Sequence, residues 1–159
     1  MDHDEIIAKI KNMYIMLLYA ITKEDIDRVR QYLSDDLASE YEEKIKDNIA
    51  NNVVQKYGEL NVSKVDIVSD QDGIVIANIV AKYIDYKIDR ETRKFMSGET
   101  TRSSHNVVLR VNCNPNNKEL VYRCKNCGAH LNINLTSVCS YCNEPVDNDD
   151  SPYVIESIN

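Results

Sequence analysis

Apolar residues recur at helical spacing over the first third of the chain. From Ile6 to Ile21 they return every three or four residues and form one wide stripe, which predicts a helix that packs one face against a core. A helix lying on a membrane surface is the competing interpretation, but the few lysines among acidic residues disfavour it. Thr22, with Asp25 three positions later, has the pattern of a capping box and predicts a second, short helix that ends at about Leu33.

A third helix is predicted to begin at Ser34. This residue precedes two acidic residues, Asp35 and Asp36, so a hydroxyl cap and negative charges would both lie at the positive end of a helix. The helical pattern extends to about Tyr57. Its predicted buried row is Leu37, Tyr41, Ile45 and Ile49.

After Gly58 the pattern changes to the alternation of strands. Apolar residues from Leu60 to Ile67 alternate with polar ones, with a slip of one position that a β-bulge would absorb. Asp72-Gly73 predicts a hairpin turn. The run from Ile74 to Ile88 is rich in β-branched residues and tyrosine, and it predicts a long, curved central strand covered by helices.

The remaining pattern completes an antiparallel meander. Asp89 to Gly98 is polar and predicts a hairpin tip, Thr100 to Asn112 predicts a returning strand, and Tyr153 to Ile155 predicts a last strand. Three helices followed by long antiparallel strands predict an α+β fold, in which the helices cover one face of a curved sheet. Such a sheet encloses a cone.

Composition and charge narrow the classes of partner. At 159 residues and 43% hydrophobic content, the chain suits one domain with a small appendage. The longest apolar run, Met13 to Ile21, is too short to cross a bilayer, and the acidic N-terminus lacks a signal-peptide pattern, so we expect a cytoplasmic protein. A net charge of −7 disfavours nucleic acid. It also disfavours strong direct binding to anionic membranes, since Arg90, Arg93 and Lys94 form the only basic cluster.

Four cysteines near the C-terminus have the spacing of a metal site. They form two CxxC pairs, Cys124 with Cys127 and Cys139 with Cys142. Two such pairs predict a zinc ribbon in which four thiolates fill the tetrahedral coordination of one Zn²⁺ ion, so the metal would be structural. Redox dithiols, disulfides and an iron–sulfur cluster are the alternatives. The fifth cysteine, Cys113, is predicted to be a buried thiol.

The order of elements, the text YLSDDL at Tyr32 to Leu37 and the text CKNCGAHLNINLTSVCSYC around the cysteines carry a resemblance. Together they resemble the zinc-ribbon-bearing bacterial branch of the translocase of the inner mitochondrial membrane subunit 44-like family. The resemblance implies the cone fold of the nuclear transport factor 2-like superfamily. It also implies an adaptor role related to protein transport or associated with a membrane.

The chain is expected to divide into three parts. Residues 1–123 would form the cone, residues 124–146 the zinc ribbon inserted before the last strand, and residues 147–159 the strand that returns to the cone sheet. Metal binding would then close the inserted loop and hold the last strand in register.

The favoured function is a non-enzymatic binding or scaffold protein with a protein or peptide partner or a small apolar ligand in the cone. Its candidate cavity residues are Ala77, Ala81, Tyr83, Asp85 and Tyr86. The alternative is a small isomerase-like or hydrolase-like enzyme, for which Asp85 beside the two tyrosines is the nearest candidate. Strand alternation places Tyr83 and Asp85 on one face and Tyr86 on the other. Ten tyrosines against one phenylalanine would suit a ligand with polar and apolar parts.

Overall fold

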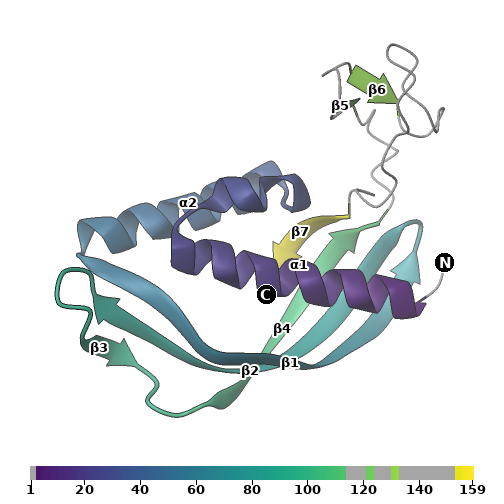
Figure 1. Cartoon of the computed structure of the whole chain (residues 1–159). Helices are drawn as coiled ribbons and strands as arrows, with labels where there is room; N and C mark the ends of the chain where they lie inside the picture. The colour runs from purple at the N-terminus through teal and green to yellow at the C-terminus, as the bar shows by residue number, and fades with distance from the viewer. Residues whose placement is uncertain (1–2, 114–120, 124–129, 133–152) are drawn as a thin grey trace.

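The computed structural model describes residues 3–113, 121–123, 130–132 and 153–159 (Figure 1). It contains two long helices, α1 (His3–Lys23) and α2 (Asp35–Ala50), joined by two short 3₁₀ turns at Ile26–Arg28 and Arg30–Tyr32. The strands are β1 (Val53–Gln71), β2 (Ile74–Asp89), β3 (Phe95–Gly98), β4 (Ser103–Asn112), β5 (Val121–Arg123), β6 (His130–Asn132) and β7 (Val154–Ile158).

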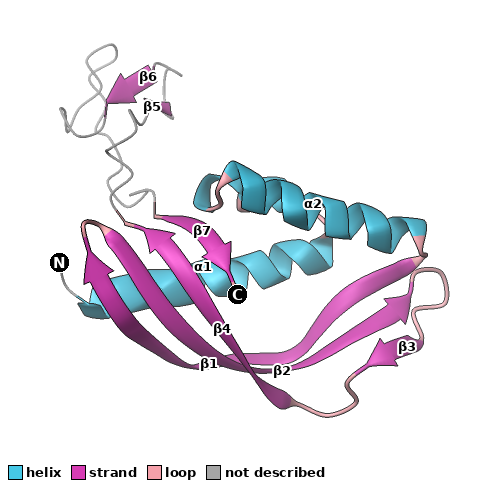
Figure 2. Cartoon of the chain, turned by 180° about the vertical axis from the view of Figure 1, so that it is seen from behind, coloured by secondary structure: helices cyan, strands magenta, loops and turns pink. Residues whose placement is uncertain are grey.

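One antiparallel sheet carries the fold. Its strand order is β1-β2-β4-β7, and β3 pairs with the end of β2. The sheet is strongly curled, and both helices lie on its concave side (Figures 1 and 2). The core forms where α1 meets this face, and it includes Ile6, Ile10 and Leu17 of the helix and Ile79, Leu109 and Ile155 of the sheet, each 0% or 1% exposed. The predicted α+β class is confirmed, and the curled sheet with N-terminal helices is compatible with a nuclear transport factor 2-like cone.

The predicted strands from Leu60 to Ile67 and from Ile74 to Ile88 are confirmed, and they lie within β1 and β2. Their register shifts at three places, including between Val62 and Lys64 where the sequence pattern slips. Each shift bends β1 and increases its twist, which curls the sheet. At the hairpin turn Asp72 and Gly73 have φ angles of 56° and 78°, the left-handed conformation that a tight hairpin requires at both central residues.

The predicted second helix is wrong, because α1 continues through Thr22 to Lys23. The next residue, Glu24, takes a φ of 58° and ends the helix. The N–H of Glu24 donates to the carbonyl of Ile21, and the N–H of Asp25 donates to that of Ala20. These two hydrogen bonds form a Schellman motif, so Thr22 lies in the last turn of a helix and does not cap a new one. Residues 26–32 then form only the two 3₁₀ turns.

The predicted start of the next helix is confirmed and its predicted end is wrong. Ser34 caps α2, since its Oγ accepts a hydrogen bond from the N–H of Leu37 at 3.2 Å. The helix ends at Ala50, and Val53–Tyr57 belongs to β1, where it pairs with Asp85–Asp89 of β2. In the predicted buried row, Leu37 and Ile45 are buried, Tyr41 is half-buried and Ile49 is 51% exposed.

Ser34 also joins α2 to the last strand. Its N–H donates to the carbonyl of Ile155 at 2.9 Å, and its hydroxyl donates to the carbonyl of Glu156 at 3.3 Å. β7 in turn pairs with β4 through partners such as Val111 and Ile155. The segment that contains the two CxxC pairs therefore lies, in sequence, between two neighbouring strands of the sheet.

We predict that Ser34→Ala lowers the free energy of unfolding by about 1 kcal/mol, because it removes the helix cap and the hydroxyl contact with β7 at one position. Urea denaturation of both proteins measures the difference. Ser39→Ala is the matched control, since Ser39 lies exposed within the same helix and should change the stability little. Equal stability of the two variants would contradict the capping role of Ser34.

Candidate binding cavity

A cavity of about 450 Å³ lies between the two helices and the concave face of the sheet. Four tyrosines line it, Tyr14 from α1, Tyr41 from α2, Tyr57 from β1 and Tyr83 from β2, and we call it the tyrosine cavity. Its apolar lining is Leu18, Ile21, Val107 and Ile158. Its polar lining is Lys44, Asp47, Asn48, Gln55 and Lys87. A volume in this range, with apolar walls and a few polar groups, is typical of a ligand site.

The four phenols form a packed cluster. The rings of Tyr57 and Tyr83 meet edge to face, with centroids 5.3 Å apart, and a hydrogen bond joins the side chains of Tyr14 and Tyr83. Burial raises the pKa of Tyr41 to about 12 and raises the pKa values of Tyr14, Tyr57 and Tyr83 as well. The cluster is therefore uncharged at neutral pH, and each phenol can donate or accept a hydrogen bond.

The five residues proposed from the sequence fall in three places. Tyr83 lines the tyrosine cavity, whereas Asp85 and Tyr86 line a smaller cavity beyond it. The ring of Tyr86 stacks against Phe95 of β3, with centroids 6.2 Å apart. Ala77 and Ala81 are fully buried in the core and do not line the tyrosine cavity. A larger residue at either alanine would disrupt core packing without filling the cavity.

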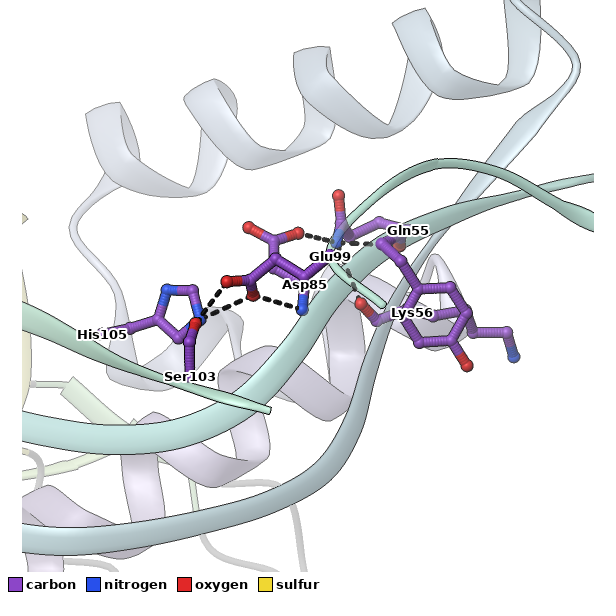
Figure 3. Close-up of polar contacts among 7 residues, drawn as sticks. Gln55, Lys56, Asp85, Glu99, Ser103 and His105 are labelled. Carbon is purple, nitrogen blue, oxygen red and sulfur yellow. Dashed lines mark hydrogen bonds and ion pairs between the residues drawn. The ribbon is translucent and has the colours of Figure 1, made fainter. Parts of the chain in front are cut away.

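A chain of polar contacts crosses the sheet beside the tyrosine cavity (Figure 3). Gln55 Nε2 donates to Asp85 Oδ1 at 2.6 Å, and the N–H of Asp85 donates to Glu99 Oε1 at 2.8 Å. Glu99 also accepts a hydrogen bond from the hydroxyl of Ser103 and lies 2.9 Å from His105 Nε2. The bond from Ser103, followed by that from the N–H of Asp85, lowers the pKa of Glu99. Glu99 is therefore held as a carboxylate.

Ser103, His105 and Glu99 are of the residue types found in catalytic triads, but their geometry is not that of a triad. In a triad the histidine contacts the nucleophile with one ring nitrogen and the acid with the other. Here the serine and the glutamate both contact Nε2 of His105, at 3.1 Å and 2.9 Å. The ring also stacks on Tyr83, with centroids 3.9 Å apart. This arrangement fixes His105 in place and does not activate the hydroxyl for attack.

Asp85 differs from the base of an isomerase-like site. Such a base needs a carboxylate in an apolar pocket next to the hydrogen-bonding acid or phenol. Asp85 instead accepts a hydrogen bond from the amide of Gln55 and lines the smaller cavity, away from the apolar lining of the tyrosine cavity. Sequence reasoning selected Asp85 and missed Glu99, because no local pattern shows that Glu99 follows β3 and contacts β4.

The remaining predicted sites have separate outcomes. Cys113 is buried, and burial raises the pKa of its thiol to about 11, which confirms the prediction of a buried thiol. Arg90 forms a bidentate ion pair with Glu24, from Nη1 to Oε1 at 2.7 Å and from Nη2 to Oε2 at 2.6 Å. Its Nη2 also donates to the carbonyl of Val53. Its charge therefore serves the fold, which reduces the basic cluster at the hairpin tip to Arg93 and Lys94.

The predicted zinc ligands Cys124, Cys127, Cys139 and Cys142 lie outside the described residues. Within the ranges that the structure describes, no three His, Cys, Asp or Glu side chains are grouped as metal ligands. No helix in those ranges is long and apolar enough to cross a membrane.

We predict that the free energy of unfolding falls as the pH rises from 10 to 12, and that each buried tyrosine contributes to this fall. The pKa of Tyr41 is higher in the folded state than its ordinary value of 10.0, so the folded state holds the proton more tightly. This stabilisation is present below the unfolded pKa and is lost as the pH rises through the folded pKa. Unfolding by urea across this range measures the loss, and Tyr41→Phe should make it smaller. Tyr19→Phe is the control because Tyr19 is 52% exposed; a Tyr41→Phe variant with the wild-type pH dependence would contradict the buried phenol.

Comparison with known proteins assigns the chain to a family. The model of the Tim44-like domain matches residues 1–108, which include both helices, β1 to β3 and most of β4. No curated protein matches the chain. The match spans more than half of the sequence and includes every element that lines the tyrosine cavity except the last strand. This chain belongs to the Tim44-like domain family.

Proposed function

We propose that this protein is a non-enzymatic binding protein, in which the tyrosine cavity holds the apolar part of a small ligand or of a partner's peptide segment. The observation that carries the proposal is the lining of the cavity. Leu18, Ile21, Val107 and Ile158 supply an apolar surface next to four uncharged phenols. A ligand would gain about 25 cal/mol for each Å² of apolar surface that it buries there.

The phenols define the polar part of the ligand. Tyr14 and Tyr83 hydrogen bond to each other, while Tyr41 and Tyr57 line the same cavity. Since a phenol both donates and accepts, these two side chains suit a ligand with carbonyl, ester or hydroxyl oxygens next to its apolar part. Both alkyl esters and extended peptides have this combination.

The family supports a role as an adaptor. The match to the Tim44-like domain suggests a protein partner and a role related to transport or associated with membranes. We infer that the cavity binds either a peptide segment of a protein partner or a small apolar ligand that such a partner delivers. The geometry of Glu99, Ser103 and His105 favours this proposal over an enzyme, because Glu99, whose pKa is lowered, is a weak base for the hydroxyl of Ser103. Neither Ser103 nor His105 lines the tyrosine cavity.

We predict that the protein binds the uncharged fluorescent probe N-phenylnaphthylamine and that Val107→Trp weakens this binding several-fold. Val107 lines the tyrosine cavity, so an indole there would fill the space that the probe needs. Fluorescence titration measures the affinity. Val108→Trp is the matched control, because Val108 is the next residue in β4 and lies 39% exposed on the opposite face. Equal weakening by both variants, or no binding by the wild type, would refute the proposal.

We further propose that Cys124, Cys127, Cys139 and Cys142 hold one structural Zn²⁺ ion. Four thiolates at this spacing suit a closed tetrahedral site. β5 and β6 form a two-stranded antiparallel sheet, and Cys124 and Cys127 lie in the sequence between these strands, as in a zinc knuckle. Because β4 and β7 are paired, a metal that shortens the connection between them would lower the entropy lost when β7 pairs.

We predict that replacing Cys124 and Cys127 by serine removes the bound zinc, lowers the melting temperature of the whole protein and speeds amide exchange in β4 and β7. Metal analysis, calorimetry and hydrogen exchange measure the three effects. Cys113→Ser is the control for metal content, because Cys113 lies in the core and should leave the zinc bound. Unchanged exchange in β4 after zinc loss would show that the metal holds only its own segment.

A further inference from the structure

A second cavity, of about 270 Å³ and more open to solvent, adjoins the tyrosine cavity. Its lining includes Asp85, Ser97, Gly98 and Glu99, and it shares two residues with the tyrosine cavity, Gln55 and Lys87. Tyr83, Asp85 and Lys87 follow one another at alternate positions along β2. The two cavities are therefore neighbours along this strand.

The side chain of Gln55 lies between the two cavities. Its Nε2 is within hydrogen-bonding distance of three acceptors, the carbonyl of Lys56 at 3.0 Å, Asp85 Oδ1 at 2.6 Å and the carbonyl of Tyr86 at 3.2 Å. An amide nitrogen has two hydrogens, so both are used. A shared lining residue that is held on three sides acts as a fixed partition, because turning it aside would break all of these bonds.

The second cavity differs from the first in its chemistry. Polar side chains dominate its lining, including the carboxylates of Asp85 and Glu99, and Glu99 is held in its charged form. Gly98 brings β3 close to β2: a Cβ atom at this position would lie 2.5 Å from the carbonyl oxygen of Asp85. The space therefore suits a small polar group that bears hydrogen-bond donors and no negative charge.

We propose that Gln55 is a specificity-determining residue that limits the length of the ligand, and that the second cavity takes the uncharged, hydroxyl-bearing end of an unbranched amphiphile only when Gln55 is displaced. The inference rests on the proposed function of the tyrosine cavity. The apolar chain lies against Leu18, Ile21 and Val107, and a chain too long for that space must displace Gln55 to place its polar end beside Asp85 and Glu99. The hydrogen bonds that Gln55 Nε2 makes to these acceptors oppose this displacement.

Monoacylglycerols of increasing chain length test the proposal, by their displacement of N-phenylnaphthylamine from the full-length protein. Each methylene that leaves water should raise the affinity by about fourfold until the tyrosine cavity is full, after which the affinity should level off. In Gln55→Ala the rise should continue to longer chains. Gln71→Ala is the matched control, since Gln71 lies exposed at the far end of the same strand, and it should keep the wild-type limit.

Two further measurements separate the outcomes. Asp85→Asn keeps the size of the side chain and weakens the hydrogen bond that holds Gln55. It should therefore shift the chain-length limit in the same direction as Gln55→Ala, but by less. This variant tests the role of Gln55 even if Gln55→Ala folds poorly. Fatty acids of matched length should gain less than monoacylglycerols in Gln55→Ala, because their carboxylate would face Asp85 and Glu99. The same chain-length limit in wild type, Gln55→Ala and Asp85→Asn would overturn the role of Gln55 while leaving the tyrosine cavity as a binding site. Wild-type protein that binds no chain of any length would overturn both.

Discussion

The packing of α1 across the concave face of the sheet is the contact on which the rest of the structure depends. The helix runs the length of the sheet, from His3, which hydrogen bonds to Asp70 at the end of β1, to Glu24, which pairs with Arg90 just after β2. The exposed contact between His3 and Asp70 adds little energy on its own, whereas Arg90 and Glu24 form a bidentate pair with little exposure to solvent. Their importance is positional, because they hold the apolar stripe of the helix against the buried residues of the sheet, where burial supplies the stability.

The same helix explains why the interior is closed at one end and open at the other. Near its start, Ile6 and Ile10 are fully buried in the core. Toward its end, Tyr14, Leu18 and Ile21 form one wall of the tyrosine cavity. The register shifts in β1 curl the sheet, while α2 reaches the cavity through Tyr41 and Lys44 without closing it. A core and a binding cavity therefore share one surface, and a ligand would extend the core that α1 begins.

Local patterns predicted the elements whose signals are local. Ser34 before two acidic residues and Asp72-Gly73 between alternating runs have backbone conformations that short-range chemistry decides, and both formed as expected. Thr22 had an equally good capping pattern and failed, because Glu24 closes the preceding helix and pairs with Arg90, which is distant in sequence. Val53–Tyr57 continued a helical pattern and became a strand, since its pairing with β2 outweighs its local preference.

The candidate site was predictable in part for the same reason. Alternation along β2 placed Tyr83 and Asp85 on one face, but which of them lines the main cavity depends on Gln55 and Glu99, which come from other parts of the chain. Ala77 and Ala81 share the face of Tyr83, yet both are fully buried within the apolar core and line no part of the tyrosine cavity. Residue type and period give the face of a strand, whereas the depth of a cavity depends on the elements packed above it.

Because its aromatic residues are tyrosines and not phenylalanines, the cavity has hydroxyl groups in its wall. Phenylalanine rings at the same four positions could close onto one another, because an apolar surface gains stability by excluding water. Each phenol hydroxyl instead needs a hydrogen-bond partner, and burying one without a partner costs free energy. Tyr14 and Tyr83 meet this need for each other, and the side chains of Tyr41 and Tyr57 line the same open space. Under the proposed function, the polar part of a bound ligand would supply hydrogen-bond partners for Tyr41 and Tyr57 in this space.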